Sequence, residues 1–104
     1  MIRHIVVLAL RKGSDTANVK QVMGELGALV DVLPGFVAFE HGPNLDFEQK
    51  STGYPYGFIC TFADARALQT YADDRTHKAL GVRLVALCKG GADGIMVIDL
   101  EVPA

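Results

Sequence analysis

The stretch IRHIVVLALR, residues 2–11, decides how the rest of the chain is interpreted. Its side chains alternate between two faces, one of which carries Ile2, His4, Val6, Leu8 and Leu10. Both faces are apolar in the middle of the stretch, which is typical of a strand covered on both sides. A histidine within such a strand places a polar ring among apolar side chains, where it needs a hydrogen-bonding partner.

A helix and a second strand are predicted to follow. Residues 13–15 form a turn and helix-capping signal, and apolar residues then recur at helical spacing over about 15–33. The Pro-Gly pair at 34–35 ends that helix. Residues 36–40 predict a strand, and the polar stretch 41–53 predicts a long loop, of the kind that is often functional or part of an interface.

The second half of the chain repeats this order. Residues 54–62 predict a third strand, with Tyr54, Tyr56, Phe58, Cys60 and Phe62 on one face. Asp64 is a candidate N-cap for a short helix that carries Tyr71. A second helix is expected from about residue 76 to the glycines at 90 and 91, and residues 95–102 predict the last strand.

This order of elements is that of an α+β, ferredoxin-like βαββαβ domain, in which helices cover one face of an antiparallel sheet. The 104 residues fit a single domain, 1–104. The uncovered face would expose Ile5, Val7, Ala9, Ile59 and one face of the last strand. Apolar patches of this kind usually mark an interface, so we expect a homodimer packed through the sheet face, as a homodimeric α+β barrel.

The net charge, the apolar segments and the cysteines of the chain limit which molecules it is expected to bind and where it is expected to be located. The net charge is −2 and the ten basic residues are scattered, so nucleic acid and anionic membrane surfaces are not expected as partners. No segment approaches the roughly 18 apolar residues that span a bilayer, and the start has no small-residue cleavage site, so a cytoplasmic location is predicted. Cys60 and Cys88 are interpreted as reduced, buried residues that act as small hydrophobes.

Three side chains are the candidates for chemistry: His4, Tyr71 and His77. The last two bracket a short polar break, YADDRTH, between apolar-periodic stretches. An imidazole with a pKa near ~6.5 exchanges protons at working pH, and a phenol with a pKa of about 10 stays protonated and donates a hydrogen bond. Such general acid–base assistance contributes roughly 10²–10⁴ in rate. Meeting in one apolar pocket, the three would support acid–base catalysis.

Further side chains are predicted to line that pocket. They are Val6, Leu8, Val22, Met23, Leu26, Phe58 and Cys60. The chain has no His/Cys/Asp cluster at metal-ligand spacing and no phosphate-binding glycine loop, so neither a metal nor a cofactor is expected. A small hydrophobic ligand is the expected partner besides a second copy of the chain.

The chain resembles the stress-responsive A/B barrel (Dabb) domain family over essentially its whole length. The resemblance rests on residues 3–8, 39–44 and 53–54, on Tyr71 and His77, and on residues 98–102. It implies a dimeric α+β barrel. Some members of the family are plant proteins induced by stress, with no settled reaction. Others are similar to olivetolic acid cyclase, which closes a linear polyketide.

The resemblance to those cyclases implies a role for each candidate residue. Their catalytic histidine, tyrosine and histidine fall on His4, Tyr71 and His77. His77 would then be the general base, Tyr71 would donate a hydrogen bond to a carbonyl oxygen, and His4 would orient the Tyr71 hydroxyl. This chain has Asp-Arg at 74–75 where many members have His-Pro. It also lacks the cyclase's aromatic rings on the first helix, so the substrate is not carried over.

Two other functions remain open. The first is a non-catalytic stress-responsive or small-ligand-binding dimer, in which His4 and Tyr71 are core residues and His77 merely begins its helix. The second is a cofactor-free monooxygenase-like enzyme that acts on a phenolic compound. His41 follows a strand at the start of a loop and is expected to be exposed.

Overall fold

The computed structural model of the chain describes residues 1–13 and 16–104. Ser14 and Asp15, which belong to the predicted capping signal, lie outside the described residues. The elements are β1 (Ile2–Leu8), α1 (Thr16–Ala28), β2 (Phe36–Pro43), β3 (Tyr56–Phe62), α2 (Ala65–Asp73), α3 (Arg75–Leu87) and β4 (Ile95–Glu101). Short 3₁₀ turns at Leu29–Asp31 and Gly91–Gly94 lie between them.

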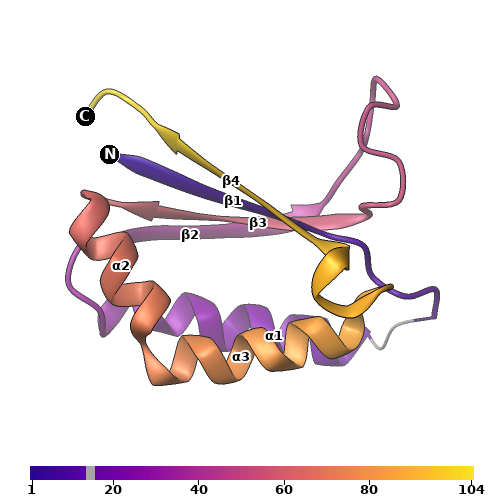
Figure 1. Ribbon diagram of the computed structural model, residues 1–104, viewed down its shortest axis with the longest axis horizontal. Coiled ribbons are helices and arrows are strands. Elements are labelled where there is room, and N and C mark those ends of the chain that lie inside the picture. The colour runs from indigo at the N-terminus through magenta and orange to yellow at the C-terminus, as the bar shows by residue number, and fades with distance from the viewer. Residues whose placement is uncertain (14–15) are drawn as a thin grey trace.

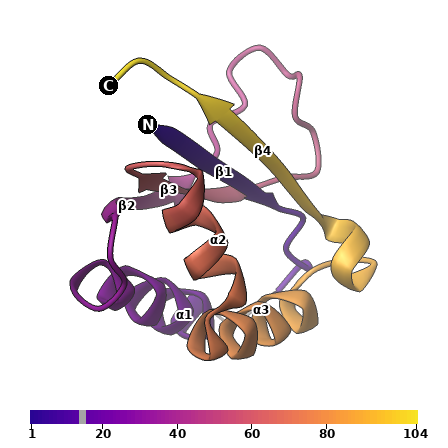
Figure 2. The same ribbon diagram turned by 60° about the vertical axis from the view of Figure 1, so that its left-hand side comes forward.

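The four strands form one antiparallel sheet in the order β2-β3-β1-β4, which confirms the predicted ferredoxin-like fold. β1 lies in the interior of the sheet, and its Leu8 is opposite both Tyr56 of β3 and Ile95 of β4. All three long helices cover the same face of the sheet (Figure 1; Figure 2). The arrangement leaves the other face of the sheet without a cover of its own.

The helix-facing side of β1 forms the base of the core, as its alternation predicted. Val6 and Leu8 are buried there, whereas Ile5 and Val7 on the other face are half-buried. The core continues through α1, β3, α2 and α3, with Met23, Leu26, Phe58, Cys60, Phe62, Tyr71, Leu80 and Leu84 among its buried members. Burial of these apolar side chains is the main favourable contribution to folding.

The first helix is shorter than its apolar periodicity predicted. α1 ends at Ala28, and the chain then tightens into a 3₁₀ turn in which the backbone N–H groups of Val32 and Leu33 both donate to the carbonyl oxygen of Leu29. Tightening of the last turn is common at helix ends, and the residue before a proline avoids the α conformation. The prediction of a helix through residue 33 was therefore wrong at its C-terminal end.

The boundary between the second strand and its loop also differs from the prediction. β2 runs to Pro43, since His41 and Gly42 pair with β3. Because β2 is an edge strand, Pro43 can end it without removing an interior sheet hydrogen bond. β3 begins at Tyr56, so Tyr54 belongs to the loop, where its carbonyl oxygen accepts from the Asn44 side chain at 2.8 Å.

The capping signals in the second half correspond to observed caps. The Asp64 carboxylate accepts a hydrogen bond from the backbone N–H of Ala67 at 2.9 Å, as predicted for an N-cap. The Asp74 carboxylate caps α3 in the same way, so this helix begins at Arg75 rather than at residue 76. β4 ends at Glu101, one residue before its predicted end.

The uncovered face of the sheet is apolar. Met96, Ile98 and Leu100 of β4 are exposed there, beside the half-buried Ile5 and Val7 of β1. None of the helices in residues 1–13 and 16–104 combines the length and apolar character that crossing a bilayer requires.

Candidate functional site

The three residues singled out from the sequence lie together between the sheet and the helices. The rings of Tyr71 and His77 have centroids 3.9 Å apart, and the His4 ring meets the Tyr71 ring at 5.7 Å with its edge. Asp74 sets the spacing of the first pair, because it ends α2 and caps α3. The polar break in the sequence is thus the sharp corner that brings the last turn of α2 against the first turn of α3.

His77 lies in the first turn of α3, where its backbone N–H donates to the Asp74 carboxylate at 2.9 Å. Its ring Nδ1 is buried and has no hydrogen-bond partner among the described residues. Burial lowers the pKa of His77 below its ordinary value, and the carbonyl groups of Ala72 and Tyr71 oppose that shift only in part. The neutral imidazole is therefore favoured at neutral pH.

His4 is held by a carboxylate on the neighbouring strand. Its Nδ1 is 2.6 Å from Oδ1 of Asp99, which is its register partner on β4. An ionised carboxylate only accepts hydrogen bonds, so Nδ1 carries the proton and donates it. This contact fixes the orientation of the imidazole and leaves Nε2 as the nitrogen that can accept a proton. His4 thus forms a hydrogen bond with Asp99, whereas its contact with Tyr71 is an edge contact between the two rings rather than a hydrogen bond to the hydroxyl.

Tyr71 is part of the core as well as of the site. Its side chain is 1% exposed and packs on the rings of Phe36 and Phe62 at centroid distances of 5.4 and 5.1 Å. The Cys60 thiol donates weakly to its hydroxyl at 3.8 Å. Burial raises the pKa of Tyr71 well above its ordinary value and that of Cys60 to about 12. Both groups therefore stay protonated at neutral pH.

A cavity of about 430 Å³ opens beside these residues, a size within the range of small-molecule sites. Its wall consists of His4, Val6, Leu26, Phe58, Tyr71, His77, Lys78, Gly81, Val82, Leu84, Val85, Ile95 and Val97. Val6, Leu26 and Phe58 were predicted to line a pocket and do so here. The other predicted pocket residues, Leu8, Val22, Met23 and Cys60, are absent from this wall and are buried in the core.

Sequence reasoning missed two parts of this site. One is Asp99, which the antiparallel register of β1 and β4 places opposite His4. The signal in the sequence was an acidic residue within the otherwise apolar run of residues 95–100. The other is the wall formed by α3, where Gly81, Val82 and Val85 face the cavity. Helical periodicity assigns a face to these residues but does not say whether a neighbouring element fills the space beside it.

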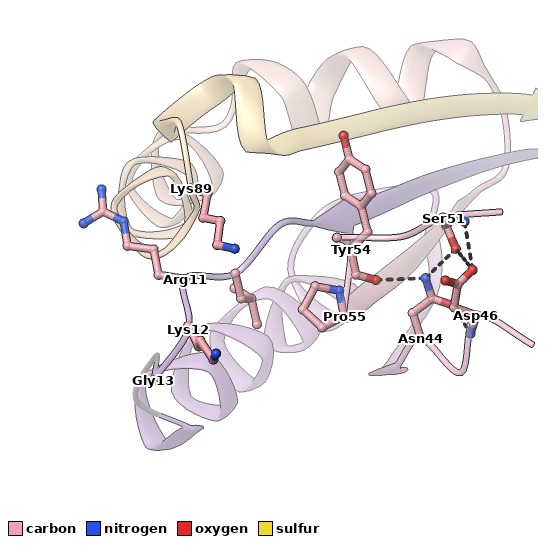
Figure 3. Close-up of a pocket in the computed structure, with 11 residues that line it drawn as sticks. Arg11, Lys12, Gly13, Asn44, Asp46, Ser51, Tyr54, Pro55 and Lys89 are labelled. Atoms are coloured by element: carbon pink, nitrogen blue, oxygen red, sulfur yellow. Dashed lines mark hydrogen bonds between the residues drawn. The ribbon is translucent and has the colours of Figure 1, made fainter. Parts of the chain in front are cut away.

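A second, larger cavity of about 500 Å³ lies at the loop end of the sheet. Figure 3 shows the basic residues Arg11, Lys12 and Lys89 at one end of it and Asn44, Asp46 and Ser51 at the other. The Asp46 carboxylate accepts from the hydroxyl and the backbone N–H of Ser51, at 2.7 and 2.8 Å. The polar groups of the loop thereby satisfy one another. None of the three candidate residues lines this cavity.

The described residues contain no group of three or more His, Cys, Asp or Glu side chains placed to hold a metal ion. The two cysteines are buried free thiols, as interpreted from the sequence. The arrangement therefore offers two imidazoles, a phenol and a carboxylate for proton transfer and hydrogen bonding.

Comparison with known proteins identifies the family. The model of the Dabb family, the stress-responsive A/B barrel domain, matches residues 2–102. The chain belongs to this family, which confirms the resemblance found in the sequence. This Dabb protein is 22% identical over 100 residues to the stress-response A/B barrel domain-containing protein HS1 of Arabidopsis thaliana, covering 96% of this chain and 88% of the relative.

Solved structures share the fold of this Dabb protein. A dimeric ferredoxin-like protein of unknown function from Jannaschia sp. CCS1 is 50% identical, with a TM-score of 0.91 and coverage of 97% of this chain and 98% of that one. A hydroxynitrile lyase from Passiflora edulis is 15% identical, with a TM-score of 0.81 and coverage of 98% and 93%. At that identity the second likeness concerns the fold alone.

Proposed function

We propose that this Dabb protein is a cofactor-independent, polyketide cyclase-like acid–base enzyme that acts on a small hydrophobic or aromatic compound. The observation that carries the proposal is that His77 stacks on Tyr71 and lines an apolar cavity, while its buried Nδ1 has no hydrogen-bond partner among the residues that the structure describes. Buried polar atoms are nearly always hydrogen-bonded, so an unsatisfied ring nitrogen beside a cavity is uncommon in a purely structural histidine and supports a functional role for His77.

The proposed reaction is an intramolecular aldol closure. Neutral His77 takes the proton from a carbon next to a carbonyl group, and the Tyr71 hydroxyl donates a hydrogen bond to the enolate oxygen that results. The enolate carbon then forms a bond to a second carbonyl carbon, whose oxygen receives the proton back from His77. His4, oriented by Asp99, offers Nε2 to a polar group of the substrate. No outside oxidant or reductant is required.

The fold is compatible with catalysis. The hydroxynitrile lyase from Passiflora edulis has the same fold, which supports an enzymatic role without indicating the substrate. The apolar character of the wall, with Leu26, Phe58 and Val85 among its members, favours a substrate with an aromatic or alkyl body.

The test is the closure of a linear poly-β-keto thioester with an alkyl tail, followed by chromatography and mass spectrometry. His77→Ala and Tyr71→Phe are each expected to lower the rate by roughly 10²–10⁴. The matched control is His41→Ala, because His41 is exposed, bonds Tyr56 at 2.6 Å and does not line the cavity. Rates that are unchanged in both site variants would refute the proposal.

A homodimer through the open sheet face is the second part of the proposal. The exposed apolar residues Met96, Ile98 and Leu100 support it, as does the dimeric state of the relative from Jannaschia sp. CCS1. Sedimentation equilibrium tests it. Ile98→Lys should shift the protein toward monomer, whereas Val32→Lys, a change at an exposed valine outside the sheet, should not.

One observation favours the non-catalytic alternative, a small-ligand-binding dimer. The Tyr71 hydroxyl is next to the Cys60 thiol in the core, where it serves packing as well as chemistry. A ligand that binds in the cavity and is released unchanged, with affinity that depends on His77 but no turnover, would favour this alternative. The monooxygenase-like function and a cytoplasmic location stay predictions.

A further inference from the structure

The loop between β2 and β3 displays two large apolar side chains to solvent. Leu45 is 87% exposed and Phe47 is 94% exposed. The loop rises on the side of the sheet opposite the helices, in both views (Figure 1; Figure 2). It therefore projects from the open face through which we propose that the protein dimerises.

The loop has a defined shape. The side chain of Asn44 joins its two ends by donating to the carbonyl oxygen of Tyr54 at 2.8 Å, and it accepts from the backbone N–H of Asp46 at 2.9 Å. The Asp46 carboxylate binds the backbone N–H groups of Lys50 and Ser51. A loop held in this way loses little conformational entropy on binding, so its apolar tip is prepared for a contact.

The 430 Å³ cavity has an exposed apolar rim, formed by Val82 and Val97, which we call its mouth. Val82 of α3, on its wall, is 71% exposed, and Val97 of β4 is also exposed. The register places Ile95, which lines the cavity, at the loop end of the sheet, because Leu8 is opposite both Ile95, where β4 begins, and Tyr56, where the loop joins β3. The loop and the start of β4 thus lie at the same end of the sheet.

Dimer symmetry decides where the loop of a second copy lies. Both edge strands, β2 and β4, have a free edge, and a two-fold dimer can close a barrel either with β2 of one copy beside β4 of the other or with each edge strand beside its own counterpart. The loop contact inferred below requires the first arrangement. Two sheets that pack face to face have this arrangement when the two-fold axis of the dimer runs parallel to the strands. Such an axis does not reverse the strand direction, so the loop ends of both sheets lie at the same end of the dimer. The loop of each copy then passes the edge of β4 in the other copy.

We propose that Phe47 of each copy covers the mouth of the other copy's cavity, against Val82 and Val97, so that each site is completed by the second subunit. The inference rests on the proposed dimer and cavity. It explains why a rigid loop exposes an aromatic side chain and why the rim of the cavity is apolar. Its test is read without a substrate, so that its failure and the failure of the proposed reaction are distinguishable.

The test is a cross-link between two chains that each carry one added cysteine, Phe47→Cys and Val82→Cys, and that are co-expressed with different tags and mildly oxidised. The native Cys60 and Cys88 are buried. A disulfide-linked heterodimer is expected on a non-reducing gel. The matched control replaces Val82→Cys by Val32→Cys, since Val32 is similarly exposed (68%) but precedes β2, whose first residue lies at the opposite end of the sheet. The control pair should not be linked.

A labelling experiment does not depend on disulfide geometry. In the dimer, the thiol of Val82→Cys should react with a maleimide several-fold more slowly than that of Val32→Cys, and adding Phe47→Ser should restore the faster rate. A monomeric protein, equal linking of both pairs, or equal labelling of the two thiols with no effect of Phe47→Ser would each overturn the proposal.

Discussion

The two cavities of this protein differ in what surrounds them more than in size. The cavity at the loop end, of about 500 Å³, is bordered by polar groups that bind one another, such as Asp46 and Ser51. The cavity beside the helices, of about 430 Å³, has mostly apolar walls and a buried His77 nitrogen without a hydrogen-bond partner in the part of the chain that the structure describes. The larger cavity thus combines a hydrogen-bonded loop with a basic end, whereas the smaller one places two imidazoles and a phenol beside an apolar wall.

Polar residues therefore have two different roles in this protein, one in the loop and one beside the helices. In the loop, hydrogen bonds among the side chains and the backbone build its shape. Beside the helices, packing builds the shape, and the polar atoms stay available at a cost in desolvation. Volume alone would favour the larger cavity, whereas the residues that line the smaller one support our proposal that it is the site.

The largest effect that tests this comparison is on stability. Tyr71→Ala removes a ring that is 1% exposed and packs on Phe36 and Phe62, so the free energy of unfolding should fall by about 3–5 kcal/mol. Tyr54→Ala at the other cavity removes a partly exposed ring and should cost less than about 1 kcal/mol. Urea unfolding measures both. Similar losses would show that the two cavities are packed alike.

The second prediction concerns pH. Because burial lowers the pKa of His77, the unfolded chain takes up a proton at higher pH than the folded chain does. The free energy of unfolding should therefore decrease as pH falls from the ordinary histidine value of ~6.5 toward the lowered pKa, and be unaffected by His77 above it. Chemical unfolding across this range measures the slope. His77→Gln should flatten it, and an unchanged slope in the variant would contradict the assignment.

The neutral form of His77 is also the base in the proposed reaction. The rate should therefore hold down to pH values below ~6.5 and fall only as pH approaches the lowered pKa. A rate that rises as the pH falls through this range would require the protonated ring instead. The same pH profile measured on His41→Ala provides the control.

A third, local effect is expected in the loop. Hydrogen bonds from the side chain and then the backbone of Ser51 lower the pKa of Asp46, so its carboxylate holds the loop until pH falls through that lowered pKa. Asp46→Gly removes the carboxylate without strain at a positive φ of 46°. Amide hydrogen exchange at Lys50 and Ser51 should become several-fold faster. Gln49→Gly, also at a positive φ, is the control, and equal rates in the two variants would refute the role of Asp46.

The smallest effect on stability is expected at Asp99. Because this carboxylate is exposed, Asp99→Asn should change the free energy of unfolding by less than about 1 kcal/mol. It should nevertheless lower the fraction of His4 with the proton on Nδ1, which nitrogen NMR of the ring measures. An unchanged tautomer would show that Asp99 does not orient His4. Because asparagine has nearly the same shape as aspartate, this variant tests the effect of Asp99 on the His4 ring with little change in the stability of the protein.

The order of elements was predictable from local patterns. Alternation in residues 2–11 located β1, and the Asp64 cap located the start of α2, because both signals depend on neighbours in sequence. Helix and strand ends were less predictable. α1 stopped at Ala28 and β2 continued to Pro43, since those limits depend on backbone hydrogen bonds to groups distant in sequence or on competition at a helix end.

Alternation and helical spacing were enough to predict the ferredoxin-like fold, and the resemblance to the Dabb family drew attention to His4, Tyr71 and His77. The partners of these side chains became known only from the packed structure. Strand register gives His4 its partner Asp99, and the corner between α2 and α3 buries a His77 nitrogen that has no partner among the described residues. The tertiary structure also places Met23 in the core and opens a wall along α3. Such contacts join residues far apart in the chain, and local patterns do not record them.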